Sequence, residues 1–166
     1  MKRLLAAGVL ALCLMTSQIA RADENRNVKI KAEIAHNYLL WQEAFKIKDP
    51  ERVISNESPD FTNVLEDGQV RSKKDTDALW RDTMKKIRKV HSASIAIKKL
   101  SIEPNRVVVV AKHNFDVDLE RSDKVVERYV VVFQSRDIWV EYDRVWMLKR
   151  MEDLHTKLTI NGEPVN

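Results

Sequence analysis

Apolar residues recur at steps of three and four positions between Asn25 and Lys48. This spacing is typical of an amphipathic helix of about six turns with one apolar stripe. The stripe comprises Ile30, Ile34, Tyr38, Trp41 and Phe45, with Ala35 and Leu39 beside it. Asp49-Pro50 should end the helix, because the residue before a proline is disfavoured in the helical region.

The segment after this proline predicts shorter elements. We expect a brief helix over residues 51–56, a turn at residues 58–60, and a short strand that returns through an Asp67-Gly68 turn. Ser72 is a good N-cap for a third helix over residues 73–89. The buried side of that helix would carry Trp80, Met84 and Ile87, flanked by Leu79 and Thr83.

After His91 the apolar period changes from helical to every second residue. The segment "SIAIKKLSI" keeps its apolar residues on one face only if a β-bulge lies at Lys98-Lys99. "RVVVVAKHNFDVDL" then alternates apolar with polar residues, and two further long strands, residues 125–141 and 145–158, meet at Asp143-Arg144. Four long antiparallel strands with one apolar face, packed against helices on one side, predict an α+β fold.

The stretch "FQSRDIWVEYDRVWMLKRMEDL" places two tryptophans seven positions apart, each in a run that alternates bulky with charged residues. Strand alternation accounts for this pattern, so the pattern indicates two strands and is not by itself evidence of a catalytic site. Without a bulge, Asp137 and Trp139 share the inward face with Tyr129, whereas a single bulge would turn Arg136 inward instead. The sequence leaves this register open.

The first residues have the pattern of a secretory signal. Lys2-Arg3 precede an apolar run over residues 4–15, and Ala20-Arg21-Ala22 provides an A-x-A cleavage site. The run is well short of the roughly 20 residues needed to span a bilayer. A lipoprotein signal at Cys13 is a weaker alternative, because a leucine precedes it where such signals have a small residue. We expect residues 1–22 to be removed and the protein to be exported, to the periplasm or outside the cell.

Removal of this signal would change the composition of the chain in two ways. The only cysteine, Cys13, would be lost, so residues 23–166 would fold as a single domain without a disulfide. The net charge would fall from +4 to about +1, because three basic residues and no acidic residue precede Asp23. A near-neutral exported domain gives no support to nucleic acid or a membrane surface as its partner.

The C-terminal motifs resemble those of one protein family. The chain is similar to the SnoaL-like branch of the nuclear transport factor 2-like superfamily, over nearly all of residues 23–166. The matching residues are Arg136-Asp137, Trp139-Val140, Trp146, Leu148 and Asn161-Gly162-Glu163-Pro164. The pattern departs at the last tight turn, where the family has a glycine before the tryptophan and this chain has Asp143-Arg144-Val145.

This resemblance implies a cystatin-like cone, in which a strongly curved antiparallel sheet wraps around N-terminal helices and a pocket lies at the open end. Isomerases, dehydratases, polyketide cyclases, epoxide hydrolases and non-catalytic binding proteins share that architecture. The fold therefore does not fix the function, which has to be argued from individual residues.

Three residues are candidates for catalysis. His113 lies on the apolar face of its strand and could act as general acid or base, although a core histidine bonded to the structure is the more common case. An inward Asp137 would have a raised pKa and could accept a proton, but a fixed ion pair with an arginine is the more common arrangement. Tyr129, or Tyr38, could donate to a developing oxyanion.

A ligand pocket would be lined mainly by apolar and aromatic side chains, and we expect about half of the candidates to be ordinary core residues. The candidate lining residues are Tyr38, Trp41, Phe45, Phe61, Trp80, Met84, Phe115, Arg136, Trp139 and Trp146. No metal and no cofactor is expected, because the histidines form no pair at ligand spacing and no phosphate-binding glycine loop is present. The basic run over residues 85–89 is typical of a solvated helix face.

Three functions fit these observations. The first, narrowly favoured, is an exported domain that binds a small apolar molecule in the cone. The second is a cofactor-independent lyase or isomerase with His113 or Asp137 as its base and a tyrosine as its acid. The third is a homodimeric interaction module that associates through the outer face of the sheet. The residues expected on that face are Val108, Val110, Val130 and Val132.

Overall fold

The computed structural model describes the backbone of residues 2–165 and the side chains of residues 24–165, in two compact units, Met1–Ile34 and Ala35–Asn166. The first unit belongs to helix α1 (Lys2–Lys46), where an exposed Lys29–Glu33 ion pair of 3.7 Å joins successive turns. Side chains of the predicted signal lie outside the described residues, and its cleavage remains a prediction. Within the described part of the chain, no helix combines the length and apolar composition needed to cross a membrane.

The helices of the second unit begin and end largely where the sequence predicts. After α1, Asp49 caps helix α2 (Pro50–Ile54), since its side chain accepts from the backbone N–H of Arg52. Ser72 caps helix α3 (Lys73–Lys86) in the same way, which confirms the predicted N-terminus. The predicted C-terminus at residue 89 is wrong, because Ile87 is extended and pairs with a neighbouring strand.

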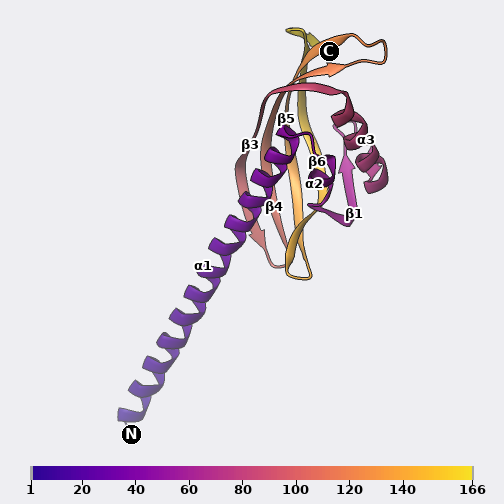
Figure 1. Cartoon of the computed structure of the whole chain (residues 1–166). Helices are drawn as coiled ribbons and strands as arrows, with labels where there is room; N and C mark the ends of the chain where they lie inside the picture. Colours follow the sequence, from indigo (N-terminus) through magenta and orange to yellow (C-terminus); the bar gives the residue numbers. More distant parts are fainter. Residues whose placement is uncertain (1, 166) are drawn as a thin grey trace. The chain divides into compact units, whose positions relative to one another are not determined.

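One seven-stranded sheet follows, and its four long strands form consecutive antiparallel pairs as predicted. The predicted bulge is confirmed, because the pairing of β3 with β4 shifts between Ile97 and Lys99. The spatial order is β2-β1-β6-β5-β4-β3, and β7 pairs with the C-terminal end of β6. Figure 1 labels β1 and the four long strands. The strands are β1 (Glu57–Val64), β2 (Val70–Ser72), β3 (Ile87–Glu103), β4 (Arg106–Glu120), β5 (Val126–Tyr142), β6 (Val145–Ile160) and β7 (Glu163–Val165).

Two features of the sheet were not predicted from the sequence. Residues 58–60 are not a turn: they belong to β1, which runs parallel to β6, although the ladder is interrupted between Glu57 and Thr62. Pro59 falls in this interruption, where its missing N–H breaks no ladder bond. The C-terminal tail is also ordered as a strand, because Asn161 and Gly162 take positive φ angles and return β7 onto β6.

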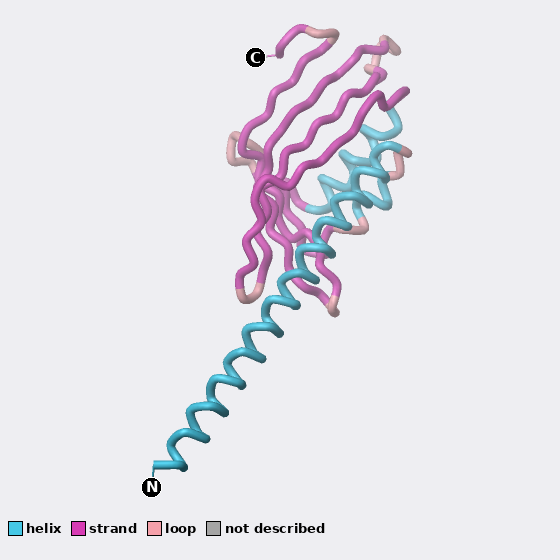
Figure 2. The backbone as a smooth tube through the Cα atoms, turned by 90° about the vertical axis from the view of Figure 1, so that its left-hand side faces the viewer, coloured by secondary structure: helices cyan, strands magenta, loops and turns pink. Residues whose placement is uncertain are grey.

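The long strands separate an inner from an outer face. Within the second unit the helices lie together on one side of the sheet (Figure 2), which we call the inner face. Alternate residues of the strands point toward them and are buried, and the intervening residues form the outer face. The buried inner residues of β4, β5 and β6 are Val107, Val109, Ala111, His113, Phe115, Val117, Ser135, Asp137, Trp139, Trp146, Leu148 and Met151.

Candidate functional site

A tyrosine from α1 and two residues of β5 form a hydrogen-bonded group inside the apolar core. The Tyr38 hydroxyl donates to Oδ2 of Asp137, and the indole Nε1–H of Trp139 donates to the same hydroxyl at 3.2 Å. The Tyr38 and Trp139 rings also meet edge to face, with centroids 5.4 Å apart. Strand alternation presents Asp137 and Trp139 to α1 together, as the bulge-free register predicts, since β4 and β5 pair without a shift.

A second polar pair lies beside the first. Nε2 of His113 is 2.9 Å from Oγ of Ser135, which is two residues before Asp137 on the inner face of β5. The imidazole stacks on Phe133 at a centroid distance of 4.2 Å and meets Trp41 edge to face at 5.1 Å. The predicted structural role of this histidine is therefore the better description of its surroundings.

Burial controls the protonation of these groups. Desolvation raises the pKa of Asp137 to about 7, although the hydrogen bond from Tyr38 and the nearby Ser135 hydroxyl partly oppose it. Desolvation also lowers the pKa of His113 to about 3, so the imidazole is neutral. The pKa of the Tyr38 hydroxyl is raised, first by burial and then by Asp137. The arginine expected beside Asp137 is absent from its hydrogen bonds within the described residues, and Tyr38 takes that place.

Two buried side-chain atoms of this core have no hydrogen-bond partner among the described residues. They are Oδ1 of Asp137 and Nδ1 of His113. A buried polar atom without a partner costs free energy, typically about 1 to 3 kcal/mol. Such atoms are rare in native interiors, and they indicate a bound water, a ligand or a functional role.

A cavity of about 20 Å³ adjoins Tyr38 and Trp139. This volume holds about one water molecule, so the side chains of the cone fill most of its interior. The walls are mainly apolar. The lining residues are Asn37, Tyr38, Trp41, Val53, Asn56, Glu57, Trp139, Leu148 and Met151.

Several lining residues were not among those that the sequence predicted, and Glu57 is the carboxylate among them. It is 5% exposed, and its Oε2 accepts from Nζ of Lys73 at 3.1 Å. Desolvation raises the pKa of Glu57 to about 7 against the opposing effect of Lys73. No pattern in "SNESPD" marks this glutamate, because its place at the cavity depends on the parallel pairing of β1 with β6.

Most of the other predicted aromatic residues fill the cone without lining the cavity. Phe45 and Phe115 stack at a centroid distance of 4.2 Å, and Trp80 meets both Trp41 and Phe45 edge to face. This cluster closes one side of the cone. The remaining predicted lining residues, Phe61, Met84 and Trp146, are buried but do not border the cavity.

The structure brings only part of the predicted site together. Tyr38, Trp41 and Trp139 border the cavity, whereas His113 and Asp137 lie behind it.

Two predicted residues lie elsewhere. The hydroxyl of Tyr129 donates to Glu127 at 3.2 Å near the start of β5, and Arg136 is on the outer face, where it pairs with Glu152 at 3.2 Å. Alternation along β5 explains the second correction, because Asp137 is inward and its neighbour Arg136 must then be outward.

The described residues contain no group of three histidine, cysteine, aspartate or glutamate side chains placed to hold a metal ion. On the outer face, Val108, Val110, Val130 and Val132 are half-buried by their neighbours. Self-association through that face remains a prediction.

Comparison with solved structures shows the fold. The chain resembles a candidate scytalone dehydratase from Novosphingobium aromaticivorans, with a TM-score of 0.67, 14% identity, and coverage of 80% of this chain and 89% of that protein. A conserved protein from Planctomyces limnophilus has a TM-score of 0.65 and 16% identity, and the match covers 82% of this chain and 98% of that protein. An NTF2-like protein from Cytophaga hutchinsonii has a TM-score of 0.58 and 15% identity, and the match covers 74% of this chain and 95% of that protein. No family model and no curated protein matches the sequence.

These likenesses and the topology define the class: an α+β domain with the nuclear transport factor 2-like fold. At such low identities the likeness concerns the fold alone, and the site has to be interpreted from its own residues.

Proposed function

We propose that this domain binds a small, mainly apolar molecule that presents a hydroxyl or amino hydrogen to the cavity beside Tyr38. The observation that carries the proposal is the donor and acceptor pattern around this cavity. Its walls are apolar on several sides, as is usual for small-molecule sites, and its polar groups include two acceptors, the Tyr38 hydroxyl oxygen and the Glu57 carboxylate.

The acceptor character follows from the bonds already made. The only proton of the Tyr38 hydroxyl is donated to Asp137, which leaves an oxygen lone pair as its available site. The side-chain amide of Asn37 donates to the backbone carbonyl of Trp146 at 3.2 Å. The carboxylate of Glu57 can only accept when ionised. A ligand that supplies a donor can therefore bond to the Tyr38 oxygen or to the Glu57 carboxylate.

The size of the cavity restricts the ligand. A space of about 20 Å³ admits about one water molecule, so an organic ligand has to displace a lining side chain. Met151 is suited to this movement, because an unbranched thioether side chain repacks easily in irregular spaces. Compact alcohols and phenols are thus favoured over large ring systems.

Binding is favoured over catalysis by His113 or Asp137, because neither residue borders the cavity. A general base has to come within hydrogen-bond distance of the proton that it removes. Glu57 is the cavity residue with a pKa near neutrality, and it supports a second candidate function, a lyase or isomerase in which this carboxylate acts as the base.

The binding proposal can be tested by NMR titration of the full-length chain with phenol, observing the indole resonances of Trp41 and Trp139. Toluene is the matched probe, since it has the same shape without the hydroxyl. We expect phenol to shift both resonances and Tyr38→Phe to weaken phenol by about fivefold, the value of one hydrogen bond, with little effect on toluene.

A cavity-filling variant supplies the control. Val53→Ile adds one methylene beside the cavity and should weaken both probes alike. Unchanged indole resonances with phenol, or equal losses of phenol and toluene in Tyr38→Phe, would contradict the proposal. Turnover of a hydroxyl-bearing substrate that disappears in Glu57→Gln would favour the second candidate.

A further inference from the structure

The outer face of the sheet carries a hollow of about 270 Å³ that is separate from the inner cavity. Its rim is basic: of the residues whose side chains the structure describes, three lysines and one histidine contribute to it, and no carboxylate does. We call it the basic groove. The residues that line it are Lys98, Lys112, Val132, Phe133, Gln134, His155 and Lys157.

The register of the strands places these cations around a common centre. Lys112 on β4 is directly opposite Gln134 on β5, which is in turn opposite His155 on β6. Two strand spacings separate the backbones of Lys112 and His155, a distance of about 10 Å. Lys157 lies opposite Val132, the next outward position along β5. Long lysine side chains on either side of Gln134 can therefore reach one ligand together.

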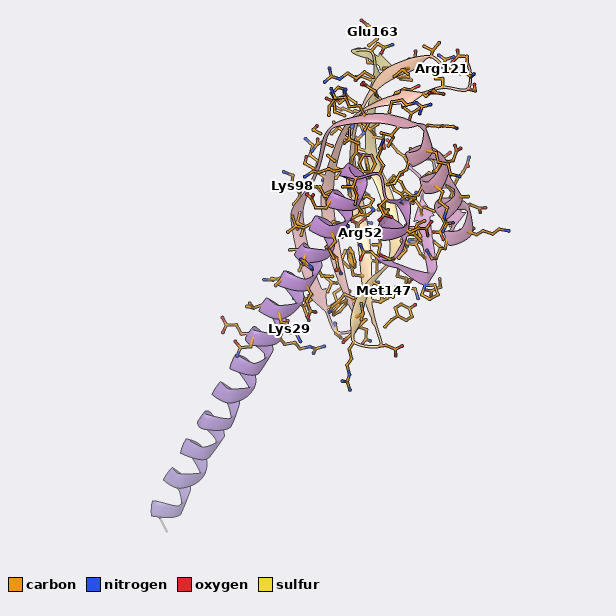
Figure 3. All side chains as sticks on the ribbon, in the orientation of Figure 1. Lys29, Arg52, Lys98, Arg121, Met147 and Glu163 are labelled. Carbon is orange, nitrogen blue, oxygen red and sulfur yellow. The ribbon has the colours of Figure 1, made fainter. Side chains whose placement is uncertain are left out.

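Two bulges flank the basic groove. The pairing of β3 with β4 shifts between Ile97 and Lys99, which makes Lys98 the extra residue, and Figure 3 shows Lys98 on β3 at the margin of the sheet. The pairing of β5 with β6 shifts between Gln134 and Ser135, where Leu154 is the extra residue. A bulge bends its strand and redirects the neighbouring side chains, so both bulges affect how the side chains of the basic groove are directed.

The pairing of charges distinguishes these lysines from other cations of the outer face. Arg128 binds Asp116 through two hydrogen bonds of 2.8 and 2.6 Å, and Arg136 pairs with Glu152. Within the described part of the chain, Lys98, Lys112 and Lys157 have no carboxylate within ion-pair distance. The one acidic contact of the basic groove joins His155 to Glu66 at 3.6 Å. Three positive charges are thus available to a ligand.

We propose that the basic groove binds a small multivalent oxyanion, a molecule with phosphate or carboxylate groups, at a site independent of the inner cavity. The spread of the cations over three strands favours an anion with several charged oxygens over a single monovalent ion. The volume of the hollow suits a small molecule, being close to the lower limit of known ligand sites.

Calorimetric titration of the full-length chain tests this proposal, with pyrophosphate and citrate as the two probes. Binding of pyrophosphate alone assigns phosphate groups as the ligand chemistry, binding of citrate alone assigns carboxylates, and each result supports the site. We expect the double variant Lys112→Gln with Lys157→Gln to weaken the bound probe about tenfold, because each partly exposed charge contact contributes up to about a fivefold change.

The matched control is the double variant Lys74→Gln with Lys85→Gln, which removes two exposed lysines from α3 and should leave affinity close to that of the unaltered chain. Urea unfolding of both double variants shows whether each is folded, and Lys98→Gln provides a separate single change on β3. Equal affinities in the groove variants and the control, or no binding of either probe up to millimolar concentration, would overturn the proposal.

Discussion

The protein contains two tyrosine–aspartate pairs in opposite surroundings. Tyr38 donates to Asp137 in the core, where burial raises the pKa of that carboxyl to about 7. Tyr142 donates to Asp60 at 2.6 Å on the surface, where hydrogen bonds from Tyr142, Lys149 and Ser58 hold the pKa of Asp60 below its ordinary value. The pKa values of the two aspartates are therefore shifted in opposite directions, although each accepts a hydrogen bond from a tyrosine.

The difference shows how solvent decides the role of a polar pair. At Asp60 water and a nearby ammonium group stabilise the carboxylate, so the pair behaves as an ordinary surface contact. Among the described residues no cation is bonded to Asp137, and desolvation dominates its pKa. The inner face thus places a proton-binding group behind an apolar cavity, whereas the outer face balances most of its charges in ion pairs.

The largest expected effect concerns the indole that joins the core pair. Trp139→Ala removes a side chain that is 2% exposed together with its hydrogen bond to Tyr38, and should lower the free energy of unfolding by about 4 to 5 kcal/mol. Ile138→Ala, on the outer face one residue earlier, should lower it by less than half as much. Urea unfolding measures both, and equal losses would mean that the two faces do not differ as described.

The second effect is a dependence of stability on pH. Asp137 has an ordinary pKa of 3.8 when unfolded and about 7 when folded, so the folded chain keeps its proton to higher pH. The stabilisation is complete below about pH 4 and is lost as the pH rises through about 7. Over this pH range, the free energy of unfolding of the unaltered chain should fall by on the order of 3 kcal/mol relative to that of Asp137→Asn.

Asp143→Asn is the control for this titration. Asp143 is exposed in the β5–β6 turn at a φ of 46°, a conformation that asparagine also adopts readily. Its free energy of unfolding, plotted against pH, should run parallel to that of the unaltered chain. Glu57 is present in every variant, so its titration contributes equally to all of them. A profile of Asp137→Asn that also runs parallel would show that Asp137 is not protonated in the core.

The third prediction compares the two pairs by one chemical change. Tyr38→Phe leaves Oδ2 of Asp137 and Nε1 of Trp139 without a partner in the core and should cost about 2 kcal/mol. Tyr142→Phe exposes Asp60 to water instead and should leave the unfolding midpoint unchanged. The comparison fails if the surface variant is destabilised as much as the buried one.

The smallest effect is expected at an ion pair of the outer face. Arg136 and Glu152 are 3.2 Å apart, with the arginine side chain half exposed. Exposed pairs contribute little, so Arg136→Ala should change stability by no more than about 0.5 kcal/mol and should not alter phenol binding. Loss of phenol binding in this variant would mean that Arg136 contributes to the ligand site, as the sequence predicted.

The inner face of the long strands could be predicted because it depends on local alternation. The period of two along β4 places His113 inward, and the same period along β5 places Asp137 and Trp139 inward, as observed. Tyr129 has the same parity as Asp137, but it lies near the start of β5, away from the cavity. Alternation specifies a face and does not specify how far along that face the helices extend.

The cavity itself could not be predicted, because non-local contacts build it. Glu57 and Asn56 reach it only through the parallel pairing of β1 with β6, which joins segments about 90 residues apart without a shared pattern. The sequence also could not show how completely the side chains fill the interior of the cone. Stacking of Phe45 on Phe115 and the contact of Trp41 with Trp80 depend on side-chain packing between elements.

The most direct test of the binding site is a crystal structure of the protein soaked with phenol. We predict density for the ring between Trp41 and Trp139, with Met151 displaced and the phenol hydroxyl within about 3 Å of Tyr38 or Glu57. An inner cavity without density for phenol at saturating phenol would contradict the account, and would identify the Tyr38–Asp137 pair as a purely structural element of the cone.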